Sequence, residues 1–143
     1  MKLINFFNED VDFVLNSKGS VISWLESIAS SENQKIDSIN YIFCSDEYLL
    51  NVNREYLDHD YYTDIITFDN RDSFDDPIES DIFISIDRVT ENSKDQDTSF
   101  ELELHRVLAH GLLHLSGYND KTKDEEQVMR EKEEAYLSLR IIK

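Results

Sequence analysis

The sequence predicts an α/β fold of the α+β kind: a single small domain with a sheet of about four strands and helices packed on it, and with a metal site at the end of a helix in the C-terminal half. Three observations predict it. The chain has 143 residues, which is long enough to bury a core without disulfides. Short apolar runs alternate with longer segments of helical periodicity. A histidine pair at helical spacing follows in the last third of the chain.

The first six elements are predicted from these runs and spacings. They are, in order, a strand at residues 3–7, a helix at 20–29, a strand at 38–44, a helix at 46–56, and strands near 65–68 and 82–86. The spacing of the first helix comes from Val21, Trp24, Leu25 and Ile28. An acidic, turn-rich loop containing Pro77 joins the last two strands, and we expect it to be solvated.

Two further helices are predicted in the C-terminal part. Thr98 with Glu101, and Thr122 with Glu125, have the spacing of capping boxes and mark where these helices begin. In the final helix the core face is predicted to comprise Met129, Ala135, Tyr136 and Leu139. The interleaved acidic and basic residues of that helix are expected to form a solvated face.

The segment 110–120 reads His-Gly-Leu-Leu-His-Leu-Ser-Gly-Tyr-Asn-Asp and has the composition of a metal site. Positions four apart lie on one helix face, so His110 and His114 can offer two imidazole nitrogens to one ion. Gly117 can take the left-handed conformation that ends a helix, which would return Asp120 toward the histidines. Two imidazoles, a carboxylate and an open position are typical of catalytic zinc sites, whereas closed structural sites mostly use thiolates, and this chain has one cysteine.

Two histidines four apart also occur by chance on many helices, so their surroundings matter. One apolar helix face is formed by Leu104, Val107, Leu108, Gly111, Leu112 and Leu115. His110 and His114 fall on the flank of this stripe, at the border between core and cleft. His105 is turned well away from the pair, and we interpret it as a surface or supporting residue rather than a ligand.

Gly111 occupies the position that holds the general base in metalloproteases of the His-Glu-x-x-His type. A carboxylate base is therefore absent at this position, and glycine is expected to leave room for a bulky group near the metal. The metal itself must then do more of the activation of water. Hydrolysis of a phosphodiester is favoured over that of a peptide, because charge neutralisation and positioning carry much of that reaction.

The pattern His-Gly-x-Leu-His-Leu-x-Gly-Tyr, followed at a fixed offset by a third ligand, resembles the signature of the YbeY family of bacterial metal-dependent endoribonucleases. Similar family segments precede it in the same order: Asn-Arg-Glu-Tyr at 53–56, Asp60, Thr-Asp-Ile-Ile-Thr-Phe at 63–68 and Asp-Ile-Phe-Ile-Ser at 81–85. The resemblance implies a cytoplasmic, zinc-dependent, single-strand-preferring endoribonuclease in ribosomal RNA maturation and ribosome quality control. It also implies that residues 1–143 form a single YbeY-like hydrolase domain, with ribosomal RNA and the ribosome as partners and neither membrane nor DNA.

Two departures from the family pattern bear on the site. Most members have a third histidine where this chain has Asp120, so the implied metal ligands are His110, His114 and Asp120. They would hold one zinc ion, although an oxygen donor makes manganese, nickel or another divalent ion a plausible occupant. The family's arginine for the phosphodiester aligns with Leu57.

No residue takes over the role of that arginine by alignment. Arg54, Arg71 and Arg106 are candidates to supply a guanidinium to a phosphate, since arginine recognises phosphate with two parallel hydrogen bonds. For any one of them, an ordinary surface arginine is the favoured interpretation. Apart from the water on the metal, the sequence identifies no catalytic group.

Composition sets the wider expectations. Fourteen basic and thirty-one acidic residues give a net charge of 14 − 31 = −17, which opposes long-range attraction to nucleic acid. An RNA enzyme with this balance needs a local positive cleft or the charge of the metal. Cys44 lies in an apolar run and is expected to be a buried, reduced thiol, which together with the lack of a signal peptide or membrane span favours the cytoplasm.

Two other functions stay open at this point. One is a metal-dependent peptidase or other hydrolase, against which Gly111 argues. The other is a metal-stabilised ribosome assembly protein without catalysis, for which Leu57 is the best support. Thr63 and Asp64 either line the cleft beside the histidine helix or cap the strand that follows them.

Overall fold

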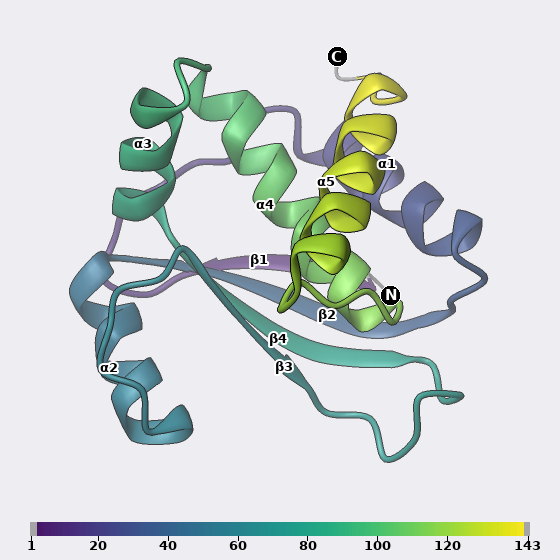
Figure 1. Cartoon of the computed structure of the whole chain (residues 1–143), viewed down its shortest axis with the longest axis horizontal. Helices are drawn as coiled ribbons and strands as arrows, with labels where there is room; N and C mark the ends of the chain where they lie inside the picture. Colours follow the sequence, from purple (N-terminus) through teal and green to yellow (C-terminus); the bar gives the residue numbers. More distant parts are fainter. Residues whose placement is uncertain (1–2, 142–143) are drawn as a thin grey trace.

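The computed structural model describes residues 3–141, and within them it contains one four-stranded sheet and five helices (Figure 1). The elements are β1 (Ile4–Asn8), α1 (Lys18–Ser31), β2 (Ile36–Cys44), α2 (Asp46–Leu57), β3 (Ile65–Asp69), β4 (Ile78–Ser85), α3 (Ile86–Asp95), α4 (Phe100–Leu115) and α5 (Lys123–Ser138). The predicted α/β class and the sheet of four strands are confirmed.

The sheet has the order β1-β2-β4-β3. Its first three strands run parallel, and β3 is antiparallel to β4 at the edge. The loop with Pro77 joins these two strands, which pair in a register that sets Ile65 opposite Ile84 and Thr67 opposite Ile82. A mixed sheet of this kind has to be covered on both faces.

Helices cover the two faces unequally. Side chains alternate between the faces of a strand, so Ile65, Ile82 and Ile84 point into a large core with α1, α4 and α5, whereas Ile66 and Phe83 point to the opposite face. That second face is covered by α2, which lies alone on its side of the sheet in Figure 1. Helix α4 lies on the first face and contacts both β3 and β4, which places the histidine segment above the edge of the sheet.

One helix was not predicted, and several boundaries differ from the predicted ones; the largest shift is the start of β4, which lies at Ile78 rather than near residue 82. The strand predicted to reach residue 86 ends at Ser85, whose hydroxyl accepts a hydrogen bond from the backbone N–H of Arg88 at 3.0 Å and caps α3. Polar residues dominate α3, and Val89 is its one fully buried apolar residue, so the sequence offers few apolar positions from which to predict it. Helix α4 is capped by Ser99 rather than Thr98, whereas the capping box of Thr122 and Glu125 is confirmed.

The buried face of α5 differs from the predicted one. Met129 and Tyr136 are buried as expected, but Leu139 lies beyond the last turn and is 69% exposed. Ala135 is also exposed, and Leu137 takes its place in the core. The acidic Glu133 is 4% exposed, so the charged residues of this helix are not all solvated.

The remaining structural expectations concern Cys44 and membrane spans. Cys44 is a buried free thiol, as predicted, and burial raises its pKa to about 12, which keeps it protonated and unreactive. Among the helices of residues 3–141, none combines the length and the apolar character needed to cross a bilayer.

Candidate metal centre

Helix α4 presents His110 and His114 side by side. The two positions are one turn apart, their ring centroids are separated by 4.6 Å, and the ring planes are nearly perpendicular, at 84°. Both side chains are partly buried, because the neighbouring positions Leu112 and Leu113 anchor the helix in the core. The pair therefore lies at the border between core and surface, as its place beside the apolar stripe predicted.

The turn after α4 brings Asp120 back to the histidines. Gly117 has φ +104°, a conformation that other residues rarely adopt, and its N–H donates to the His114 carbonyl at 3.1 Å. The chain then reverses, and Asp120 Oδ2 lies 3.2 Å from His110 Nε2 and 3.4 Å from His114 Nε2. One potential ligand atom from each residue lies within 4.8 Å of the other two. The structure thus brings together the three residues predicted to bind a metal.

Hydrogen bonds from the other ring nitrogens fix the orientation of both imidazoles. His114 Nδ1 donates to the Tyr118 carbonyl at 2.9 Å, and His110 Nδ1 donates to Glu133 Oε2 at 2.7 Å. A neutral histidine with its proton on Nδ1 has a lone pair on Nε2, the form that binds metals. Two such lone pairs and a carboxylate facing one another repel unless a cation or a proton lies between them. This donor set fits a divalent metal.

The acidic surroundings favour positive charge at this place. Burial lowers the pKa of His110, but the hydrogen bond and charge of Glu133, together with the charges of Asp120 and Asp64, outweigh it and raise the pKa above its usual value. Burial in turn raises the pKa of Asp64, although attraction to His110 opposes the shift. A bound cation would relieve the same imbalance.

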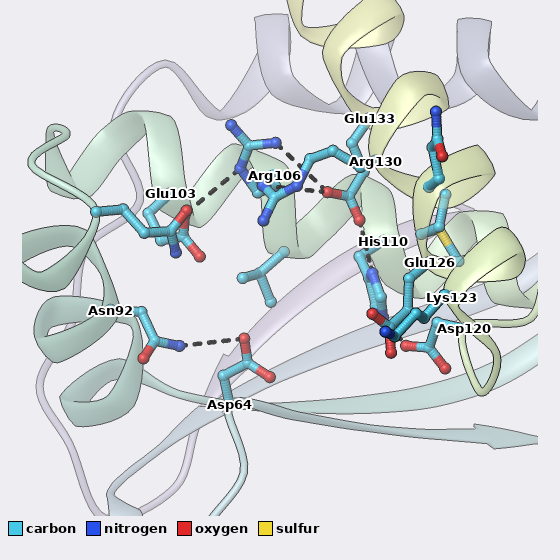
Figure 2. Close-up of a pocket in the computed structure, with 14 residues that line it drawn as sticks. Asp64, Asn92, Glu103, Arg106, His110, Asp120, Lys123, Glu126, Arg130 and Glu133 are labelled. Carbon is cyan, nitrogen blue, oxygen red and sulfur yellow. Dashed lines mark hydrogen bonds and ion pairs between the residues drawn. The ribbon is translucent and has the colours of Figure 1, made fainter.

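Figure 2 shows how Glu133 of α5 supports the site from behind. Its carboxylate lies between His110 and Arg106, whose guanidinium is 3.4 Å away. Arg106 also reaches the exposed Glu134 at 2.7 Å. Sequence reasoning missed Glu133 because it treated the charged residues of this helix as solvated. The available signal was its place four residues after Met129 and three before Tyr136, on the buried face.

Gly111 has a different role from the one expected. A Cβ atom at this position would lie 3.0 Å from Ile65 Cδ1 and 3.2 Å from Ile82 Cδ1. The glycine therefore faces the sheet and lets α4 approach β3 and β4 closely, and the expectation that it leaves space for a bulky group near the metal is wrong.

His105 is likewise not at the surface. Its side chain is 1% exposed and packs against Trp24, with ring centroids 5.7 Å apart. Burial, together with the nearby Arg140, lowers its pKa to about 4 and keeps it neutral. Helix α4 is covered on both flanks, by α1 and α5, which is why a position turned away from the ligand pair is still buried.

The three candidate arginines are all engaged within the protein. Arg54 pairs with Asp60 at 2.5 Å on the surface. The side chain of Arg71 is buried and binds Asp69 and the Leu115 carbonyl, both at 2.7 Å. Arg106 belongs to the Glu133 network, so each of the three already has its own acidic partner.

Two cavities meet at His110 and Asp120, and His114 lines one of them. The α5-side cavity, of about 560 Å³, lies between α3, α4 and α5, and its cationic lining residues are Arg106, Lys123 and Arg130 (Figure 2). The β3-side cavity, of about 410 Å³, is lined by β3, α4 and the segment after α2. Asp64, His110 and Asp120 line both. Thr63 lines the β3-side cavity, so both residues of the Thr63-Asp64 pair face the cleft.

Comparisons with known proteins agree on one family. A family model described as Endoribonuclease YbeY matches residues 4–140. Proteins named Endoribonuclease YbeY from Cytophaga hutchinsonii and Christiangramia forsetii are 58% and 50% identical to this chain; the alignments cover 96% and 95% of it, and 95% and 93% of the relatives. The solution structure of TM1509 from Thermotoga maritima is similar with a TM-score of 0.67 at 28% identity, over 94% of this chain and 87% of that one.

Proposed function

The chain belongs to the YbeY family of endoribonucleases, and on that premise we propose that it cleaves RNA at a divalent metal held by His110, His114 and Asp120. The observation that carries the proposal is the meeting of two Nε2 atoms and a carboxylate oxygen within 4.8 Å, with both Nδ1 atoms already bonded elsewhere. The three atoms repel one another unless a cation or a proton lies between them, and a divalent cation can bind all three.

Zinc is the ion that we propose, because two imidazoles and one carboxylate with an open position form a typical catalytic zinc site. When bound, such an ion supplies positive charge for the phosphodiester and activates water. The chain's own contribution is positional: Glu133 and the Tyr118 carbonyl hold the two imidazoles so that their Nε2 atoms point at one place. Asp120 adds the negative charge that favours a divalent cation there.

The finer assignments follow from the family. We propose that residues 1–143 act as one hydrolase domain on single-stranded ribosomal RNA in the cytoplasm, in ribosome maturation and quality control. The peptidase alternative is disfavoured because the position of the peptidase base, Gly111, is packed against the sheet, with no room for a carboxylate. A non-catalytic, metal-stabilised ribosome assembly protein stays the second candidate, since Leu57 replaces the family's arginine and all three candidate arginines have acidic partners.

The test compares Asp120→Asn with Asp124→Asn, an exposed carboxylate in the first turn of α5. Purified wild type and both variants are loaded with zinc and incubated with labelled single-stranded RNA, duplex RNA and a peptide library. We expect cleavage of single-stranded RNA by the wild type and by Asp124→Asn, and loss of both zinc and cleavage in Asp120→Asn. Tight zinc binding without any RNA cleavage would favour the assembly protein, and cleavage by Asp120→Asn with no metal bound would refute the proposal.

A further inference from the structure

An exposed aromatic ring is held rigidly beside the β3-side cavity. Tyr61 is 51% exposed, yet its backbone carbonyl accepts a hydrogen bond from the buried side chain of Asn53 at 2.9 Å. Its ring stands edge-on to His59, with centroids 5.1 Å apart, and its hydroxyl lies 3.1 Å from His59 Nδ1. In the segment between α2 and β3, the Tyr61 ring is therefore exposed to solvent while its backbone carbonyl and its hydroxyl both have partners.

Away from the three proposed metal ligands, the lining of this cavity is unsuited to a phosphate. Carboxylates from Asp64, Asp69 and Asp120 face it, and its lining, which lies wholly within the described residues, contains no lysine or arginine. Apart from its histidines, the other lining residues are apolar, such as Leu57 and Ile65, aromatic, as is Tyr61, or polar and uncharged, such as Asn53 and the threonines. Such a surface suits the flat, uncharged part of an RNA strand, which is the nucleobase.

We propose that the β3-side cavity binds an unstacked nucleobase of the RNA, next to the phosphodiester that is cut, with Tyr61 as the surface on which the base stacks. This inference rests on the proposed function, because the cavity is continuous with His110, His114 and Asp120. Stacking needs no positive charge, so it also explains how a chain of net charge −17 holds RNA. Each base has a π-face, so the site accepts any sequence but requires a base that is free of a duplex.

The first experiment measures steady-state cleavage of short single-stranded RNA by Tyr61→Ala and Tyr61→Phe, with Tyr56→Ala as the matched control. Tyr56 is 66% exposed on α2 but lies outside the cavity. We expect KM to rise roughly 5- to 100-fold in Tyr61→Ala, as for the loss of one stacked base, with kcat nearly unchanged. Tyr56→Ala should behave like the wild type, and Tyr61→Phe, which keeps the ring but loses the hydroxyl contact with His59, should raise KM by less than Tyr61→Ala.

A second experiment tests whether the base itself is the partner. An abasic nucleotide is moved one position at a time along the RNA relative to the cleavage point. With the abasic nucleotide at one position, the KM of the wild type should rise by the same factor as Tyr61→Ala raises it on intact RNA. The KM of Tyr61→Ala should rise little further on that abasic RNA, because the two changes remove the same interaction. Full additivity, or no effect of the abasic nucleotide at any position, would overturn the inference.

Binding without cleavage separates this inference from the proposed function. RNA that carries 2-aminopurine is titrated with protein in the presence of a chelator, and quenching of the base fluorescence reports stacking. We expect quenching by the wild type and a loss of it in Tyr61→Ala, even if the protein cuts no RNA. Cleavage by the wild type with equal quenching by both proteins would leave the proposed function intact and refute the role of Tyr61.

Discussion

The two cavities that meet at His110 differ in the charge and in the exposure of their lining residues. On the α5 side, acidic and basic side chains bind one another, and the carboxylate behind the histidine is 4% exposed. On the β3 side, the lining has no lysine or arginine, and its aromatic rim is about half exposed. The difference fits the two proposals above, in which the α5 side holds the metal ligands in place and the β3 side takes a base of the RNA.

On the α5 side, the charged groups of Glu103, Arg106 and Glu133 are largely buried together. The carboxylate oxygens of Glu133 lie 2.7 Å from His110 Nδ1, 3.4 Å from the Arg106 guanidinium and 3.9 Å from that of Arg130. Burial raises the pKa of Glu103, although the nearby Arg106 at 3.5 Å opposes the shift. Buried charges of this kind are costly to leave unpaired, so they constrain one another's positions.

Of the changes compared between the two sides, removal of the Glu133 carboxylate is expected to have the largest effect, which is on zinc affinity. Replacing Glu133 with alanine leaves His110 Nδ1 without its acceptor, and loss of such a partner typically weakens metal binding about 10- to 100-fold. Glu133→Gln keeps an acceptor oxygen and should restore part of the affinity. Zinc affinity is measured by competition with a chromophoric chelator, and nitrogen-15 NMR of the metal-free protein should show the Nδ1 proton of His110 becoming less firmly held.

Glu134→Gln is the matched control for this prediction. Glu134 contacts Arg106 at 2.7 Å but makes no contact with His110, so its removal disturbs the ion pairs and leaves the imidazole in place. Equal losses of zinc affinity in Glu133→Ala and Glu134→Gln would show that the whole charge network matters rather than the bond to His110.

A smaller effect is expected where α4 meets the sheet beside the β3-side cavity. In Gly111→Ala the added methyl group crowds Ile65 and Ile82, which costs about 1–3 kcal/mol, while alanine in place of glycine favours the helix by about 1 kcal/mol. We expect the free energy of unfolding in urea to fall by about 1 kcal/mol. Gly19→Ala in α1, where a Cβ atom meets nothing within 4 Å, should be neutral or slightly stabilising. Equal stabilisation by both substitutions would contradict the packing argument.

Features that lie within one short segment were predictable from sequence, whereas contacts between separate helices were not. The spacing of His110 and His114, and the turn at Gly117, are local features, so the meeting with Asp120 could be anticipated, although metal binding itself stays a prediction. The burial of Glu133 was signalled by its spacing from Met129 and Tyr136, but its contact with His110 could not be predicted, because that contact depends on how α5 packs against α4. Helix α3 was missed for a related reason: few of its side chains are buried, with Val89 its one fully buried apolar residue.

Gly111 and His105 were misread because the sequence shows which residues share a helix face but not what covers that face. His105 was expected to be a surface or supporting residue rather than a ligand, and it is buried because α1 and α5 cover both flanks of α4. Gly111 was expected beside open space and faces Ile65 and Ile82 instead. Helical spacing is therefore enough to group ligands, and tertiary packing decides which of their neighbours support them.

The smallest effect is expected from a substitution that gives the β3-side cavity a cation, as the α5-side cavity already has. Leu57, the last residue of α2, lines the β3-side cavity and is 40% exposed, so Leu57→Arg adds one cation to a lining that has none. We expect RNA binding to strengthen a few-fold at low salt, and the slope of log K against log salt to steepen by about 0.7 to 1. Leu139→Arg, on an exposed leucine outside the cavity, should change neither. A slope that is already steep in the wild type would mean that phosphates, not bases, dominate binding on this side.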